Sequence, residues 1–270
     1  MIRAFLLSMA LLFACLGSAP ACADVPTAAP ANDWQPQWKE LFCVVSTGDP
    51  KDLHMTVWSV PGSDRVELYL TGSRILHTSE QVSEASLRLA PGAQSIPAKA
   101  FWDAPVWRGF LHLIVEEGRA FVTGFASSRE LELSQKERTL SIAYNGADQA
   151  MREFRGCLDT HERTWGGDPI ADAALRVRPR EVGSWMSNFD YPMDALDKMQ
   201  SGIVVVRLAT DVTGKVIGCT VLQSIATKSM EDITCHQALK RGRFTAAVGA
   251  DGRPTPATFI TYVNFRVWSG

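Results

Sequence analysis

The chain carries the sequence Ile203-Val204-Val205-Val206-Arg207-Leu208-Ala209-Thr210, a run rich in β-branched and apolar residues. Such a run predicts a buried strand. Asp211-Val212-Thr213-Gly214-Lys215 follows and supplies a turn, after which residues 216–222 resume as a strand. The two strands are therefore predicted to pair as an antiparallel hairpin.

A short helix is predicted before this hairpin and a longer one after it. Met193, Leu196 and Met199 recur at helical spacing and are followed by a glycine stop at Ser201-Gly202. On the other side, Ser229-Met230-Glu231-Asp232 has the Ser-x-x-acid spacing of a helix N-terminus, and the apolar spacing continues to about Arg241.

A closing strand is predicted from Thr258 to Val267, because apolar and polar residues alternate there. One face of this strand carries Phe259, Val263, Phe265 and Val267, and the other carries Ile260, Tyr262, Asn264 and Arg266. Pro254 and Pro256 lack an amide donor, so they suit the entry to this strand rather than its ladder.

The order helix, strand, turn, strand, helix, strand resembles the C-terminal domain of the TonB family of periplasmic energy transducers. The resemblance covers about residues 184–270 and implies a small αββαβ domain with a three-stranded antiparallel sheet. The residues that carry it are Tyr191-Pro192, Gly202 to Val206, Asp211 to Val216 with Gly214, Val221, Ser224, Ala238, Arg243-Phe244 and Val263-Asn264-Phe265.

In the TonB family, the final strand pairs with a short motif in the plug of outer-membrane transporters. The resemblance implies the same role here, and an edge strand has the unpaired N–H and C=O groups for it. The expected partner is an outer-membrane transporter or another envelope protein. The candidate peptide-binding residues on this edge are Thr258, Ile260, Tyr262, Asn264 and Arg266.

Two alternatives remain open at this point. The first alternative is that the edge of the final strand is capped or paired within the molecule. The second is that the domain mediates self-association of a structural envelope protein as a homodimer, without energy transduction. A full transducer also has an inner-membrane helix with a polar residue such as histidine and a long Pro/Lys-rich spacer. The apolar lead here has Ser8 but no histidine, so a link to energy-dependent transmembrane transport rests on the resemblance alone.

Residues 1–23 are expected to be a cleaved signal peptide that directs the protein to the periplasm. They combine a basic lead, an apolar run from Ala4 to Leu16 and the small-x-small site Ala21-Cys22-Ala23. A retained anchor is disfavoured, because this run spans only about 20 Å as a helix against a bilayer core of about 30 Å. Lipid anchoring at Cys15 is a second alternative.

Cleavage after Ala23 leaves four cysteines, which permit three disulfide pairings. The preferred pairing is Cys219 with Cys235, which would tie the second strand of the small domain to its second helix, and Cys43 with Cys157. A metal site is the alternative for these cysteines, but Cys-x-x-Cys spacing is absent and the histidines are scattered.

Residues 38–159 are expected to form a mostly antiparallel β sandwich or barrel with a C-terminal helix from Ala147 to Leu158. Short alternating runs, among them Leu111 to Val115 and Phe121 to Phe125, are separated by glycine-containing turns. The whole chain is thus predicted to be α+β. Residues 24–37 are expected to be a disordered lead and residues 160–183 a polar linker. The aromatic segment Phe101 to Trp107 is interpreted as packing rather than as the lining of a ligand groove.

Composition and motifs argue against several functions. The net charge of −2 offers no basic excess for nucleic acid. Nucleophile-elbow, zinc-protease, phosphate-loop and dinucleotide motifs are absent, so neither an enzyme, a cofactor nor a small-molecule substrate is expected. Glu116-Glu117 is interpreted as a charge pair at a hairpin end, His112 as a residue of the polar strand face, and Asp232 with His236 as a surface pair.

Overall fold

The computed structural model describes residues 33–73, 75, 82–89, 93–103, 110–136, 138–167, 175, 177–182 and 184–267. The predicted signal peptide, Cys15, Cys22 and most of the predicted lead lie outside these residues. So do much of the predicted linker and residues 104–107 of the aromatic segment.

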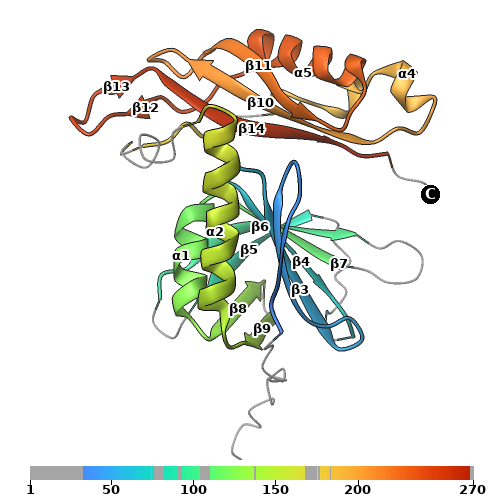
Figure 1. The fold of residues 1–270 in the computed structure, drawn as a ribbon, viewed down its shortest axis with the longest axis vertical. Coiled ribbons are helices and arrows are strands. Elements are labelled where there is room, and N and C mark those ends of the chain that lie inside the picture. The colour runs from blue at the N-terminus through green and yellow to red at the C-terminus, as the bar shows by residue number, and fades with distance from the viewer. Residues whose placement is uncertain are drawn as a thin grey trace, which may run out of the picture.

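The front half of the chain forms one curled sheet of nine strands in which every neighbouring pair is antiparallel (Figure 1). In spatial order the strands are β1 (Gln35–Trp38), β2 (Cys43–Asp49), β3 (Leu53–Ser59), β4 (Val66–Thr71), β7 (Phe110–Val115), β6 (Ile96–Asp103), β5 (Val82–Arg88), β8 (Glu130–Gln135) and β9 (Arg138–Ala143). The predicted α+β class is confirmed.

Two helices, α1 (Gly118–Ser127) and α2 (Ala147–Thr164), cover one face of this sheet and close its apolar core (Figure 1). Leucines and valines of alternate strand positions fill that core, as in β2, where Cys43 and Val45 are buried and Val44 between them is not. The helix predicted from Ala147 is confirmed and continues to Thr164, into the predicted linker.

The prediction of a strand from Phe121 to Phe125 is wrong, since these residues belong to α1. Phe121 and Phe125 are four residues apart, a spacing that fits two strand repeats as well as one helical turn. The decisive residue is Val122, which is buried while Thr123 is exposed. That pattern places Phe121, Val122 and Phe125 on one helical face.

The predicted disorder of residues 24–37 also fails where the structure can be compared with it, because Gln35, Pro36 and Gln37 belong to β1. They pair with Ser46, Val45 and Val44 of β2. Backbone pairing with β2 holds this strand at the edge of the sheet, and such pairing does not require apolar side chains. The polar composition of residues 24–37 therefore did not reveal that their last part is ordered.

The C-terminal unit begins with a 3-10 helix (Asn188–Asp190) and α4 (Met193–Leu196) and contains the sheet β11-β10-β14. Its strands are β10 (Gly202–Thr210), β11 (Val216–Ser224) and β14 (Ala257–Phe265), and α5 (Lys228–Arg241) covers one face. A minor pair, β12 (Ala247–Val248) and β13 (Pro254–Thr255), precedes β14. This is the predicted order of strands and helices.

Local details of this unit follow from cap and turn chemistry. Thr227, not Ser229, caps α5, because its hydroxyl accepts the amide proton of Met230. Gly214 has φ +81 in the hairpin turn, where an added Cβ would lie 1.9 Å from the carbonyl oxygen of Phe244. The first helix is shorter than predicted, and it leaves Met193 and Met199 exposed while Ala195 is buried.

Two disulfides confirm the preferred cysteine pairing. Cys43 of β2 is bonded to Cys157 of α2, and Cys219 of β11 is bonded to Cys235 of α5. Each bond therefore fastens a covering helix to the sheet beneath it.

The two disulfides are expected to differ in their contribution to stability. The loop closed by Cys43 and Cys157 spans a sequence separation of 114, against 16 for the other pair. Chain entropy then predicts a loss of about 5 kcal/mol for Cys43→Ala with Cys157→Ala and about 3 kcal/mol for Cys219→Ala with Cys235→Ala. Urea unfolding of the two double variants measures the difference, and a larger loss for the second variant would contradict this ranking.

Candidate functional site

Strand β14 forms one edge of the C-terminal sheet. It pairs with β10 from Gly202↔Phe265 to Thr210↔Ala257, while β11 occupies the other side of β10. Within the described residues, no backbone group of residues 258–265 forms a hydrogen bond outside this ladder. Pro254 and Pro256 precede the ladder, as expected. Alternate amide and carbonyl groups of β14 therefore point away from the sheet, and no strand formed by the described residues receives them.

The two faces of β14 have different neighbours. Phe259, Val263 and Phe265 point into the core beneath α5, as their alternation predicted. Ile260 and Tyr262 point the other way, but they are only 4% and 5% exposed, because that face of the sheet lies on the front domain. The expectation that Tyr262, Asn264 and Arg266 face outward thus differs from the structure. Thr258 is exposed, and Asn264 and Arg266 are half-buried.

A cluster of apolar side chains joins the two domains. The Tyr262 ring lies 5.5 Å from the Trp58 ring between centroids, and Ile260 packs on Gly62, where an added Cβ would lie 2.7 Å from the Ile260 side chain. Only glycine fits this turn, which also has φ +76. The other buried members of the cluster are Leu41, Val60, Trp165 and Val205.

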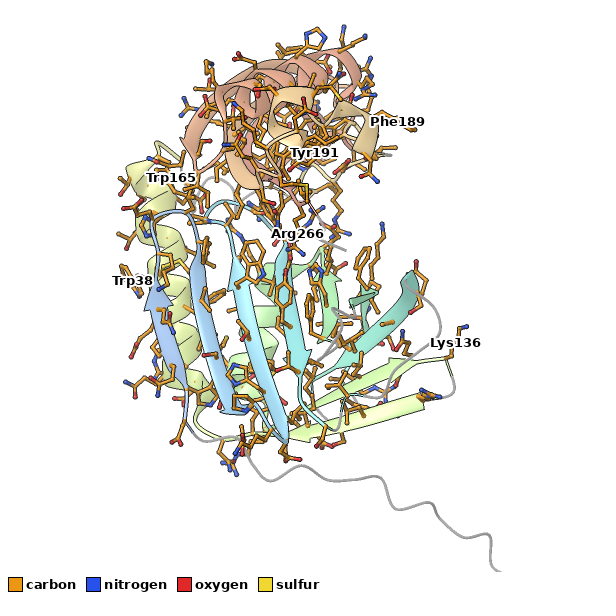
Figure 2. The ribbon with its side chains drawn as sticks, turned by 90° about the vertical axis from the view of Figure 1, so that its right-hand side faces the viewer. Trp38, Lys136, Trp165, Phe189, Tyr191 and Arg266 are labelled. Carbon is orange, nitrogen blue, oxygen red and sulfur yellow. A yellow bond between two sulfur atoms is a disulfide. The ribbon has the colours of Figure 1, made fainter. Side chains whose placement is uncertain are left out.

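At the centre of the contact, the buried carboxylate of Glu67 in β4 accepts three hydrogen bonds. Tyr262 donates to Oε1, Tyr69 donates to Oε2 at 3.0 Å, and Nε2 of His112 lies 2.6 Å from Oε2. Arg266 donates to the hydroxyl oxygen of Tyr69 at 2.7 Å, and the His112 ring stacks on Tyr69 at 4.4 Å. Two residues predicted for peptide binding, Tyr262 and Arg266, therefore bind the front domain. Figure 2 shows Arg266 at the junction of the two domains.

The charge states in this cluster follow from the burial of Glu67. Burial alone would raise the pKa of Glu67. The hydrogen bond and electrostatic attraction from His112, together with the hydrogen bonds from Tyr262 and Tyr69, outweigh this effect and lower the pKa of Glu67. Burial and the nearby Glu67 charge raise the pKa of Tyr69 to about 12 and the pKa of Tyr262 well above its ordinary value. Both phenols thus keep the proton that they donate.

A cavity of about 300 Å³ flanks the first half of β14, at the seam between the domains. Thr258 and Ile260 line it on the strand side, and Glu162 and Gly166 line it at the end of α2. Arg207 of β10 also lines it and has one weak hydrogen bond, from Nη1 to the Trp165 carbonyl oxygen at 3.5 Å. The front domain thus supplies one wall of the space next to the edge strand.

Other residues singled out from the sequence are separate from this site. Glu116 pairs with Arg65 at 2.9 Å and Glu117 with Arg180 at 3.3 Å, so they do not act as one unit. Asp232 pairs with Lys228 on the surface of α5. His112 does face away from the leucines of β7, but the face it occupies is the domain contact. Glu67 and Tyr69 were missed, although the alternation of β4 places both on one face.

The domain contact is expected to weaken in acid. Because the folded-state pKa of Glu67 is lowered, its stabilising contribution is present above the ordinary carboxyl pKa and is lost as pH falls through the lowered value. Glu67→Gln should remove this pH dependence, whereas Glu84→Gln, at an exposed position, should keep it. Unfolding free energies between about pH 3 and 7 test this. An unchanged acid profile in Glu67→Gln would refute it.

Removal of the Tyr262 hydroxyl tests the same contact at neutral pH. Tyr262→Phe keeps the ring against Trp58 but deletes a hydrogen bond to a charged acceptor, which should cost about 1.5 to 3 kcal/mol. The exposed Thr258→Val serves as a control with little expected effect. Equal stability of Tyr262→Phe and the unaltered protein would contradict the assigned bond.

The comparisons with known proteins bear on the C-terminal part of the chain. Residues 187–267 match the family model described as Gram-negative bacterial TonB protein C-terminal. No curated protein and no solved structure matches the chain. Among the residues that the structure describes, none of the helices has the length and apolar character needed to cross a bilayer. The matched segment contains the whole sheet β11-β10-β14 together with α4 and α5, which confirms the resemblance to the TonB C-terminal domain for this part of the chain.

Proposed function

We propose that the protein binds an extended segment of an outer-membrane transporter or another envelope protein, which adds as a fourth strand beside β14. The observation that carries this proposal is the nine-residue ladder of β14 with β10 and the unpaired outer side of β14 among the described residues. Backbone pairing along such an edge provides affinity, and side-chain pockets at alternate positions provide sequence selectivity. The cavity that Arg207 and Thr258 line is one such position.

The place of action is the periplasm, in line with the export signal expected in residues 1–23 and with the family of the C-terminal domain. The link to energy-dependent transport is part of this proposal and rests on the family alone. The front domain acts as a support, because it holds one face of the sheet and leaves the edge of β14 open.

Proline substitution at two adjacent positions tests strand addition. Successive amides in a strand point to opposite sides. Of the two single variants Val263→Pro and Asn264→Pro, one therefore loses an amide directed at β10 and the other loses an amide directed outward. The variant that loses the outward amide should keep its circular dichroism spectrum and lose binding by about tenfold or more, since proline blocks a ladder position. The other variant should be destabilised.

The binding measurement is the recovery of solubilised outer-membrane transporters on the immobilised protein. A photocrosslinker at exposed Thr258 should label the same transporters, and one at exposed Glu84 of the front domain should not. Full recovery by the folded proline variant would exclude strand addition at β14.

Self-association is the second candidate, because the same edge and a group of exposed apolar side chains are open to a second copy. Phe189 is 99% exposed and Met193 65% exposed on the C-terminal domain, and Figure 2 shows Phe189 projecting from it. Exposed apolar groups of this kind mark interaction surfaces. Light scattering of the full chain decides: a dimer that the outward proline variant dissociates supports this candidate, and a monomer at high concentration excludes it.

A further inference from the structure

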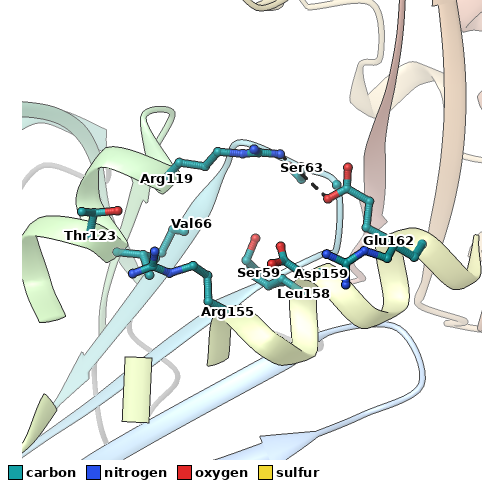
Figure 3. A pocket seen from close by; sticks show the side chains of 13 residues that line it. Ser59, Ser63, Val66, Arg119, Thr123, Arg155, Leu158, Asp159 and Glu162 are labelled. Atoms are coloured by element: carbon teal, nitrogen blue, oxygen red, sulfur yellow. Dashed lines mark ion pairs between the residues drawn. The ribbon is translucent and has the colours of Figure 1, made fainter. Parts of the chain in front are cut away.

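A second cavity, of about 360 Å³, lies in the front domain between α1, α2 and the connection of β3 with β4 (Figure 3). Its volume falls in the range of small-molecule sites. The floor is apolar, formed by Val66, Val122 and Leu158, and the hydroxyls of Ser63 and Thr123 line its rim. The proposed peptide-binding edge of β14 does not line this cavity.

Guanidinium groups surround this floor from both helices. Arg119 of α1 pairs with the buried carboxylate of Glu162 at 3.8 Å, and Figure 3 shows this pair at one end of the cavity. Arg155 extends from α2 toward the opposite end, where Thr123 lies. Arg163 also lines the cavity, one helical turn beyond Asp159.

The charges leave a positive excess in the cavity. Three guanidinium groups line it against the two carboxylates of Asp159 and Glu162. Asp159 is four residues from Arg155 and from Arg163, yet it forms an ion pair with neither within the described part of the chain. Because Glu162 pairs with Arg119, Arg155 and Arg163 retain donors for a ligand. Guanidinium groups bind carboxylate and phosphate oxygens through paired, charge-assisted bonds.

We propose that this cavity binds a small organic anion, with an apolar body against Val66, Val122 and Leu158 and a carboxylate or phosphate group held by Arg155, while Arg163, next to Glu162 in α2, adds positive charge at the other end. The polar rim sets the orientation of the ligand, and the apolar floor accounts for most of the contact area. The front domain is then a small-molecule-binding module, distinct from the domain that presents β14.

Isothermal titration calorimetry on the full chain tests this with three probes of one chain length: octanoate, octyl phosphate and 1-octanol. The two anions should bind saturably and octanol should not, and the tighter anion identifies the preferred head group. Arg155→Ala with Arg163→Ala should weaken anion binding by about tenfold to a hundredfold. Arg152→Ala is the matched control, because Arg152 pairs with Asp148 on the same helix and does not line the cavity.

A variant that fills the cavity separates a lost site from a lost fold. Thr123 is exposed and lines the rim, so Thr123→Trp should occupy the space without disturbing the core beneath α1. Its melting temperature should match that of the unaltered protein, while anion binding disappears. The proposal is overturned if neither anion binds, if octanol binds as well as the anions, or if binding survives Thr123→Trp or the double arginine variant.

Discussion

The hydrogen bond from Tyr262 to Glu67 joins residues that are 195 positions apart in the sequence, and the relation between the two domains depends on it. A buried carboxylate is costly unless it is paired and fully hydrogen-bonded. Glu67 meets that requirement only with donors from both domains, since His112 and Tyr69 come from the front sheet and Tyr262 from β14. Docking of the C-terminal sheet therefore supplies the last hydrogen bond to the carboxylate of Glu67, which the front domain already buries.

This constraint decides which parts of β14 remain uncovered among the described residues. The side chains on one face are in the core beneath α5, and those on the other contact the front domain. Only the outer backbone edge of β14 and the cavity beside its first residues remain uncovered among the described residues. Arg207, Glu162 and Thr258 line that cavity. The proposed strand addition would need little ordering of an edge that is held on both faces, and rigid presentation lowers the entropic cost of binding.

Much of the C-terminal domain could be predicted from the sequence, because its signals are local. The valine-rich run of β10, the glycine turn and the alternation of β14 each act over a few residues. The cysteine pairing was accessible because a strand and its covering helix must lie side by side. By contrast, Phe121 and Phe125 fit two periods equally well, and Val122 decided between them only in the structure.

The role of the second face of β14 could not be predicted, because Ile260 and Tyr262 alternate in the same way whether they meet water or another domain. Glu67 gave no local signal either, since an acidic residue on a strand face usually reaches solvent. The cavity between α1 and α2 depends on Thr123 and Arg155, which are far apart in the sequence and converge only when α1 is recognised as a helix.

Residue-resolved amide hydrogen exchange over residues 257–265 tests whether β14 is fixed on both faces while its outer backbone edge is open. We expect an alternating pattern, in which amides directed at β10 are protected and their neighbours in β14 exchange quickly. Uniform protection along β14 would show instead that another segment already covers this edge, so that it is closed to a guest strand.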